Sequence, residues 1–260
     1  MRPHVLQIAE DFWNIRGSFK ILGIVDVGTQ SSLVRRANGK FVLLDSYSLT
    51  GEIERQVRSL THAGEDIEAI LNVHPFHTVH ARPVHEMFPG ARLYGTARHV
   101  SRSPELPWEK AYTEDAELHA MFADDFDFSV PRGVDFISAN QNVHFSSVLV
   151  RHKASRTIHV DDTLTYIRLP KPMGRLGLAD RMAFHPSLAK ALEKRAGAAQ
   201  DFRSWATEVA EAWQDAENLC AAHSATLTAR SNRGASIHTR LLAALEKVSR
   251  TLGAHERKHG

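Results

Sequence analysis

The sequence predicts an α/β protein, and three features of the chain support this. A strand–turn–strand pattern lies in the first fifth of the chain. Apolar strand-like runs then alternate with helical patterns up to residue 94, and the segment from about 180 to 260 is alanine-rich with helical periodicity. Alternating strands and helices indicate layers of sheet and helix around a common core. We therefore expect a layered α/β protein with additional C-terminal helices.

The first half of the chain supplies the clearest elements. A turn signal at Ala37-Asn-Gly-Lys40 separates two apolar runs, which predicts a β-hairpin. A helix is predicted over residues 50–60 because Ile53, Val57 and Leu60 recur at helical spacing, with Thr50 at its N-cap. The remaining elements expected up to residue 127 are a strand at 67–73, a short helix at 83–88, a strand at 91–94 and a helix near 116–122.

The second half is predicted to contain one more hairpin and several helices. Strands are expected at 143–150 and 157–160, joined by a short turn. Helices are expected at 186–195, 201–213 and 236–252, with Gly197 and Gly253 ending the first and the last. A short strand is expected at 219–222.

Bulk composition limits the classes of protein to consider. The chain has 260 residues, 43% of them apolar and 24% charged, which is ordinary for a globular protein. We expect one domain over residues 1–260, with its helical part at about 180–260. The formal charge of +2 gives no electrostatic case for binding nucleic acid or an anionic membrane.

Location and partners follow from the same reading. The only cysteine, Cys220, cannot form an intramolecular disulfide, and we expect it to be an inert core residue. The first residues lack the apolar run of a signal peptide, and no stretch has the length of a membrane span. We therefore expect a cytoplasmic protein that acts on a small molecule, and a homodimer stays open.

A histidine-rich segment is the strongest functional signal. The chain has 16 histidines, and three lie in Asn72-Val-His-Pro-Phe-His-Thr-Val-His80, directly after a predicted buried strand. Loops at strand ends are where α/β proteins place ligands, and imidazole is the commonest metal ligand. His74, His77 and His80 are thus candidate ligands. The alternative interpretation is that they are ordinary polar loop residues.

Further candidates stand at the ends of other predicted strands. His144 opens the strand at 143–150, Asp162 follows the strand at 157–160, and His223 follows the strand at 219–222. Metal ligands are often placed at such positions. His159 is expected to point away from Asp162 by strand alternation, and it is left out of the candidate set.

The order of these parts resembles the metallo-β-lactamase superfamily. That family builds its metal site from a His-x-His-x-Asp-His loop, a later histidine, an aspartate in a Gly-Asp-Thr-Leu-like turn, and a final histidine. The resemblance spans roughly residues 15 to 225 and implies a four-layer αββα sandwich. The early strand Phe41–Asp45 also resembles the early Leu-Ile-Asp strand of that family. The matching positions are Asn72, His74, Phe76 and His77 in the loop, then His144, Asp162 and His223.

Two loop positions depart from the family's pattern. Asn72 takes the place of the first histidine, and Phe76 takes the place of the aspartate. The resemblance therefore implies one metal ion rather than two, held by His77, Asp162 and His223. Two histidines and a carboxylate suit zinc with an open position, and equally iron or manganese. His74 and His144 would line the cavity or complete the coordination, and Asn72 and His80 are further cavity candidates.

Three hypotheses about function follow from the resemblance. The first is a metal-dependent hydrolase in which activated water attacks an ester, lactone or phosphodiester-like small molecule, with Asp162 as the catalytic base because Phe76 cannot act as one. The second is a metal-free binding or scaffold protein on the same fold. The third is a non-haem iron oxidoreductase, which the same ligand set would allow.

Overall fold

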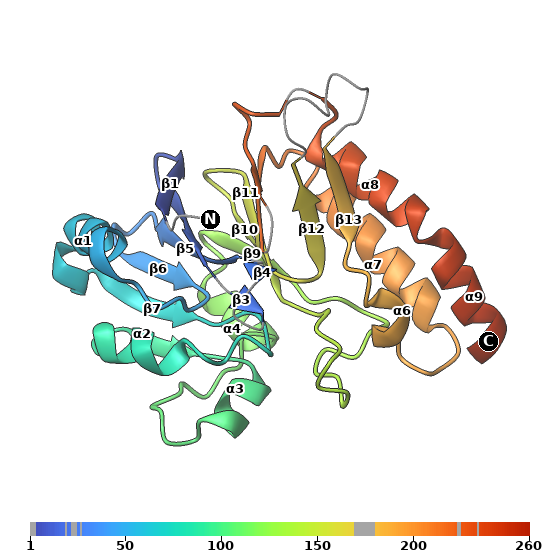
Figure 1. Cartoon of the computed structure of the whole chain (residues 1–260), viewed down its shortest axis with the longest axis horizontal. Helices are drawn as coiled ribbons and strands as arrows, with labels where there is room; N and C mark the ends of the chain where they lie inside the picture. Colours follow the sequence, from blue (N-terminus) through green and yellow to red (C-terminus); the bar gives the residue numbers. More distant parts are fainter. Residues whose placement is uncertain are drawn as a thin grey trace. The chain divides into compact units, whose positions relative to one another are not determined.

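The computed structural model describes residues 4–18, 20–21, 25–26, 28–168, 180–222, 225–232 and 234–260, and the chain divides into two parts (Figure 1). The first part consists of the described residues up to Phe128 together with Val150–His159. The second part consists of Ser129–Leu149 and Val160–Gly260. The prediction of a single domain over residues 1–260 stays a prediction.

A six-stranded sheet organises the first part. Its order is β1-β2-β5-β6-β7-β8, and the strands cover His4–Ala9, Phe12–Gly17, Thr29–Arg35, Phe41–Leu44, Ile67–Leu71 and Arg92–Tyr94. The first four strands pair antiparallel, whereas β6, β7 and β8 pair parallel. Parallel pairing brings the carboxyl ends of β6 and β7 to one edge of the sheet. The histidine segment begins at that edge.

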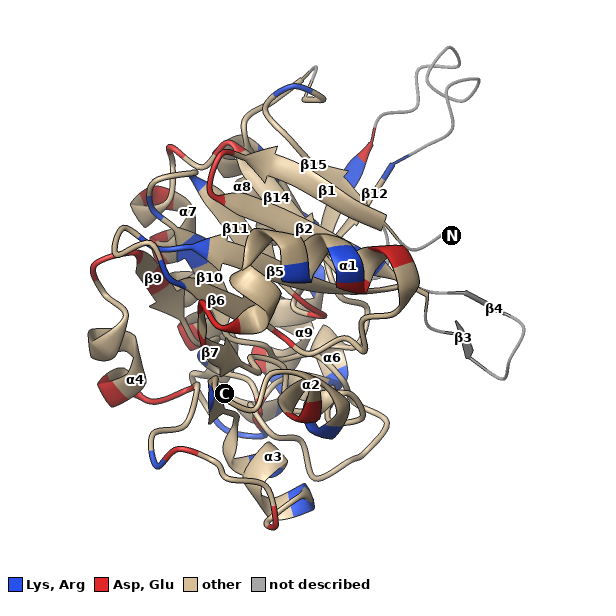
Figure 2. Cartoon of the chain, turned by 90° about the vertical axis from the view of Figure 1, so that its left-hand side faces the viewer, with Lys and Arg blue, Asp and Glu red and all other residues tan. Residues whose placement is uncertain are grey.

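The predicted hairpin and first helix are confirmed. β5 and β6 pair around a turn in which Arg36 N–H donates to Lys40 O at 2.8 Å and Gly39 has a φ of 83°. The helix α1 (Gly51–Leu60) buries Ile53 and Val57, and Thr50 stands at its N-cap without a side-chain capping bond. The first turn of this helix carries acidic residues and its last turn a basic one (Figure 2). The helix α2 (Ala81–Met87) follows β7.

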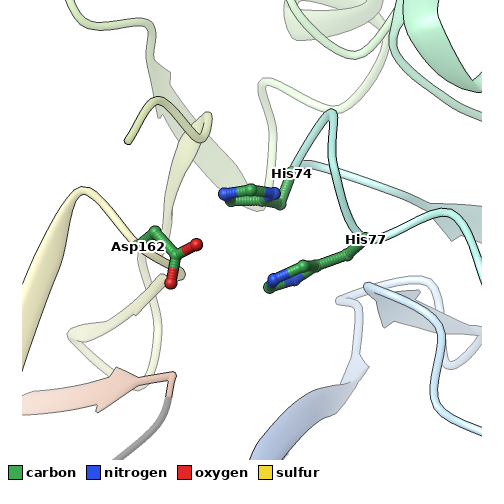
Figure 3. Close-up of side chains that lie close together, drawn as sticks. All are labelled: His74, His77 and Asp162. Carbon is green, nitrogen blue, oxygen red and sulfur yellow. The ribbon is translucent and has the colours of Figure 1, made fainter. Parts of the chain in front are cut away.

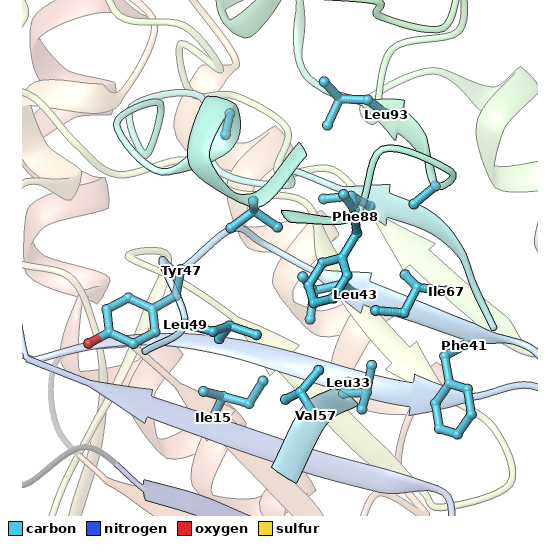
Figure 4. Close-up of a cluster of buried hydrophobic side chains, with 14 of the residues drawn as sticks. Ile15, Leu33, Phe41, Leu43, Tyr47, Leu49, Val57, Ile67, Phe88 and Leu93 are labelled. Carbon is cyan, nitrogen blue, oxygen red and sulfur yellow. The ribbon is translucent and has the colours of Figure 1, made fainter. Parts of the chain in front are cut away.

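An apolar cluster lies between this sheet and its helices. Alternate residues of the strands, such as Ile15 on β2 and Leu33 on β5, cluster with Val57 of α1 (Figure 4). Val84 of α2 belongs to the same cluster. Each such side chain is 0% exposed. Burying one aliphatic side chain of this size contributes roughly 1.5–3 kcal/mol. The period-two alternation of the strands therefore fixes which face the helices cover.

The remaining elements include a second sheet, in the order β15-β14-β11-β10-β9. Its strands cover Thr226–Leu227, Asn218–Ala221, Thr157–Val160, Leu149–His152 and Phe126–Ser129. Two-stranded sheets pair β12 (Leu164–Ile167) with β13 (Arg181–Phe184), and β3 (Lys20–Ile21) with β4 (Val25–Asp26). The predicted pairing of a strand ending near residue 150 with one at 157–160 is confirmed as β10 and β11. Short helices lie at α3 (Ala97–Arg102), α4 (Ala116–Met121) and η1 (His62–Gly64).

Helices dominate the C-terminal end of the chain. They are α6 (Leu188–Ala191), α7 (Ala198–Ala212), α8 (Ile237–Lys247) and α9 (Ser249–His259), and α7 lies beside α8 and α9 (Figure 1). Phe202 and Trp205 of α7 are buried and pack on Phe184. None of the helices in the described ranges has the length and apolar character needed to cross a membrane.

Two predicted helices are wrong in their extent. The helix expected at 186–195 is only α6, because Leu192 turns extended and bridges to Val134. Gly197, with a φ of 77°, does not end that helix and instead stands at the N-cap of α7. The helix expected at 236–252 is divided at Val248 into α8 and α9, and Gly253 lies within α9.

One predicted strand is also shorter than expected. The strand at 143–150 begins only at Leu149. The backbone before it is bound by a side chain instead of a neighbouring strand. Thr163 Oγ1 accepts from Ser147 N–H at 2.9 Å and donates to Phe145 O at 3.0 Å. His144 therefore lies in a loop and does not open a strand.

Candidate metal centre

Two histidines of the segment after β7 stack on each other. The ring centroids of His74 and His77 are 4.0 Å apart with an interplanar angle of 22°. His74 is buried and His77 is half-buried, and His77 N–H donates to His74 O at 3.1 Å. A tight turn at the end of a buried strand thus brings both rings together, as the spacing of the segment predicts.

The ring of His74 is already held by its own turn. Phe76 N–H donates to His74 Nδ1 at 3.1 Å, and the same His-Pro-x arrangement recurs where Ser187 N–H donates to His185 Nδ1 at 3.2 Å. Because Nδ1 accepts a hydrogen bond, a neutral His74 ring carries its proton on Nε2. His74 must therefore give up the hydrogen bond from Phe76 N–H before it can bind a metal, because a free lone pair on Nε2 requires the proton to move to Nδ1.

Neighbouring polar residues hold the backbone of this loop. His99, on α3, is buried and its Nε2 lies 3.4 Å from His77 O, while its Nδ1 lies 2.9 Å from Thr96 Oγ1. Burial lowers the pKa of His99 to about 3, so its ring is uncharged at neutral pH. Thr113 Oγ1 donates to Asn72 O at 2.8 Å.

Asn72 serves the fold rather than an open cavity. Its Nδ2 donates to Tyr94 O at 2.9 Å, and its Oδ1 accepts from Ser46 Oγ at 2.7 Å. The side chain is completely buried. Both ends of the amide are therefore used in joining the end of β7 to neighbouring segments.

A buried polar network joins the loop to the sheet, and the sequence did not reveal it. His159 Nε2 lies 3.0 Å from Asp45 Oδ2, and His159 Nδ1 lies 3.0 Å from Ser32 Oγ. The other carboxylate oxygen, Asp45 Oδ1, accepts from Val73 N–H at 2.8 Å, one residue before His74. Asp45 has a φ of 58°, in the left-handed region. Only the run Leu43-Leu-Asp45, a carboxylate ending a buried strand, hinted at this role.

Asp162 is the carboxylate that forms a group of possible metal ligands with His74 and His77. It follows β11 in a buried turn, beside Thr163. One ligating atom each from His74, His77 and Asp162 lie within 4.8 Å of one another (Figure 3). Imidazole nitrogen and carboxylate oxygen are ordinary zinc ligands, so the three donors fit a metal ion by type.

The ligating atoms of a second group also lie within 4.8 Å of one another. It consists of Asp45, His159 and Asp161, all buried. In this group His159 and Asp45 already bind each other, and Asp45 binds the loop backbone. We interpret this group as the support of the first one.

His80 and His144 belong to neither group. His80 is half-buried at the start of α2, with Nδ1 2.8 Å from Ser48 Oγ and its ring edge-on to Tyr47. Burial, and then the charge of His77, lower the pKa of His80. His144 is exposed and its Nε2 lies 2.8 Å from Gln141 O, so its role as a ligand stays a prediction. His223 lies outside the described residues.

Comparisons with known proteins identify the fold. No protein-family model matches the chain, and no curated protein matches its sequence. Solved structures do match over nearly the whole chain. A metallo-β-lactamase from Erythrobacter litoralis is 15% identical with a TM-score of 0.61, covering 94% of this chain and 96% of its own. A metallo-β-lactamase from Hirschia baltica is 10% identical with a TM-score of 0.59, covering 94% of this chain and 97% of its own.

A third match was solved with a single zinc ion. The metallo-β-lactamase FIM-1 from Pseudomonas aeruginosa, in its mono-zinc form, is 11% identical with a TM-score of 0.57, covering 96% of this chain and 97% of its own. The chain therefore has the metallo-β-lactamase fold, and the predicted fold class is confirmed. The C-terminal helices are present as predicted. Identities this low show the fold alone, so chemistry must be argued from the residues of this chain.

Proposed function

We propose that this protein is a metal-dependent hydrolase that uses one divalent ion. The observation that carries the proposal is the convergence of two imidazoles and one carboxylate, from His74, His77 and Asp162. These donors suit zinc, manganese or iron with a coordination position left open. FIM-1, which shares the fold, has been solved with one zinc ion.

Each ligand candidate has a distinct role in this proposal. His77 and Asp162 would bind the ion, and His223 would be the third ligand that the sequence predicts. His74, whose Nδ1 is engaged by Phe76 N–H, would line the site or complete the coordination. When bound, the ion supplies Lewis acidity, which lowers the pKa of water and polarises an ester or phosphoryl oxygen.

Asp162 would also handle the proton in the hydrolytic step. Phe76 stands where the family's loop aspartate would be, and its aromatic ring cannot accept a proton. The ring instead supports Arg98, whose guanidinium carbon lies 4.3 Å from the ring centroid. A carboxylate oxygen not used for binding the ion is then the available base for water that attacks an ester, lactone or phosphodiester. We propose substrates of this class.

Elemental analysis tests the proposal directly. Protein purified without added metal should contain about one equivalent of zinc, manganese or iron, and chelation should abolish hydrolysis of a generic ester or phosphodiester. His77→Ala and Asp162→Ala should lose both the metal and the activity. His152→Ala removes a buried histidine from outside both ligand groups and should keep both. Comparing His74→Ala with His223→Ala shows which of these residues is the third ligand.

A metal-free binding protein is the second candidate function. The hydrogen bond to His74 Nδ1 and the near-parallel stack of His74 on His77 favour it, because stacked rings do not direct their lone pairs to one point. Under this alternative, purified protein holds no metal and His77→Ala changes no reaction rate. The elemental analysis therefore separates the two candidates.

A further inference from the structure

A cavity in the second part of the chain belongs to neither ligand group. Its volume is about 370 Å³, within the range of small-molecule sites. It is lined by α6 and the residues after it, by the last turns of α9, and by the loop at 135–143. These segments all lie in the second part of the chain.

Positive charge gathers around this cavity. Lys190 and Lys194 line it from α6 and just beyond, and Lys258 lines it from α9. Asp135 is the acidic residue in the lining. Among the described residues, none of the three lysines has an ion-pair partner, whereas the neighbouring Arg195 pairs with two carboxylates.

Two histidines add hydrogen-bonding groups to the same wall. His255 and His259 line the cavity with ring centroids 4.6 Å apart. Desolvation, together with the charges of His255, Lys258 and Lys194, lowers the pKa of His259. His255 Nε2 is buried and has no hydrogen-bond partner among the described residues. A buried polar atom without a protein partner is costly, so a hydrogen bond from this atom to a ligand would be favourable.

The cavity also has apolar lining residues, which we call its apolar floor. Val143 and Leu192 line it and are each almost completely buried, at 2% and 3% exposed. A basic last turn on α9 is by itself explained by the helix dipole. That explanation does not account for Lys190 and Lys194, which face the same cavity from another segment. Neither does it account for the apolar floor.

We propose that this cavity binds a small organic phosphate. The phosphate group would lie among Lys190, Lys194 and Lys258, and the organic part would rest on Val143 and Leu192. A phosphate monoester carries nearly two negative charges at neutral pH and three acceptor oxygens, which suits several separate ammonium groups. His255 Nε2 would donate to one of these oxygens. This proposal is independent of the metal centre.

Binding of phenyl phosphate to the full-length protein tests the proposal by titration calorimetry. The Lys190→Ala, Lys194→Ala, Lys258→Ala triple variant should bind at least tenfold more weakly. The matched control removes three positive charges from α8 and α9 outside the cavity, through Lys247→Ala, Arg250→Ala and Arg257→Ala. The control should bind within about twofold of the unmodified protein. His77→Ala should bind unchanged, which separates the cavity from the metal centre.

Several outcomes would overturn the proposal. Equal weakening in both triple variants would show general charge attraction only. Equal affinity for phenyl phosphate and uncharged benzyl alcohol would show an apolar pocket without phosphate recognition. Loss of binding in His77→Ala alone would assign the phosphate to the metal centre. Thermal unfolding of each variant confirms that the protein is folded.

Discussion

Asp45 is the residue that ties the histidine loop to the sheet. Its carboxylate accepts from the Val73 N–H and binds His159, and its carbonyl oxygen accepts from Ser31 Oγ at 2.8 Å. Positive φ at a residue other than glycine costs of order 1–3 kcal/mol and persists only where surrounding bonds fix it. The strain at Asp45 therefore indicates that the position of the loop is closely determined by this network.

Replacing His159 should test that network. His159→Ala removes the Asp45 partner and leaves a buried carboxylate with less support, so we expect a loss of roughly 2–4 kcal/mol of unfolding free energy. His152→Ala is the matched control, since His152 is also buried in the β10–β11 hairpin but binds Ser155 Oγ. It should cost less, roughly 1–2 kcal/mol. Urea titration measures both.

A double-mutant cycle then separates the Asp45 bond from general packing. Asp45→Asn combined with His159→Ala should destabilise by less than the sum of the two single changes, because both remove the same bond. Strict additivity would contradict the network.

The pKa of His99 makes a further prediction at the level of one residue. The folded-state pKa is about 3, below the ordinary value of 6.5, so the unfolded chain binds a proton first as the pH falls. The contribution of the uncharged His99 to the unfolding free energy is therefore complete above pH 6.5, and it is lost as the pH falls from 6.5 to 3. His99→Gln cannot bind that proton. When the pH falls from 6.5 to 5, the unfolding free energy of this variant should fall by about 1–2 kcal/mol less than that of the unmodified protein. Parallel curves of unfolding free energy against pH would refute this.

Glycine positions in the second part act through backbone geometry. Gly133 has a φ of 71°, and a Cβ there would lie 2.0 Å from Ala198 O at the start of α7. Gly197, at the N-cap of the same helix, has a φ of 77° but only a distant side-chain atom nearby. The two sites thus share backbone strain and differ in close packing.

Alanine at these two sites should therefore have unequal effects. Gly197→Ala should cost about 1 kcal/mol, from the left-handed conformation alone. Gly133→Ala should cost clearly more, about 3 kcal/mol, because α7 must also move. Chemical denaturation compares the two variants directly. Equal losses would mean that the backbone of α7 yields to the added methyl group without cost.

The elements that the sequence predicts best are those fixed by local pattern. The hairpin at Asn38-Gly39, the helix over Gly51–Leu60 and the strand at Ile67–Leu71 each carry their own periodicity or turn signal. The errors arise where distant contacts decide. Leu192 leaves its helix to bridge Val134, and Thr163 replaces a strand partner for Ser147. Neither contact can be read from neighbouring residues.

At the scale of the whole molecule, the order of candidate ligands along the chain was sufficient to predict the fold. Solved structures of metallo-β-lactamases match nearly the whole chain. The support of the site was not predicted. Alternation along β11 suggested that His159 was irrelevant, whereas its ring is part of the network that holds Val73. The burial of Asn72, with both ends of its amide bound, likewise depends on Tyr94 and Ser46.

Metal binding should be visible as stability of the whole protein. A ligand that binds only the folded state adds RT ln(1 + [L]/Kd), about 2.7 kcal/mol when zinc is at 100 times its Kd. For a chain of this size that raises the melting temperature by roughly 5–10 °C. Zinc should therefore stabilise the unmodified protein and the His152→Ala variant, and chelator should reverse the effect. His77→Ala and Asp162→Ala should show no zinc-dependent shift. The same absence in the unmodified protein, with manganese and iron also tested, would favour the metal-free binding protein, because an ion that binds only the folded state must stabilise that state.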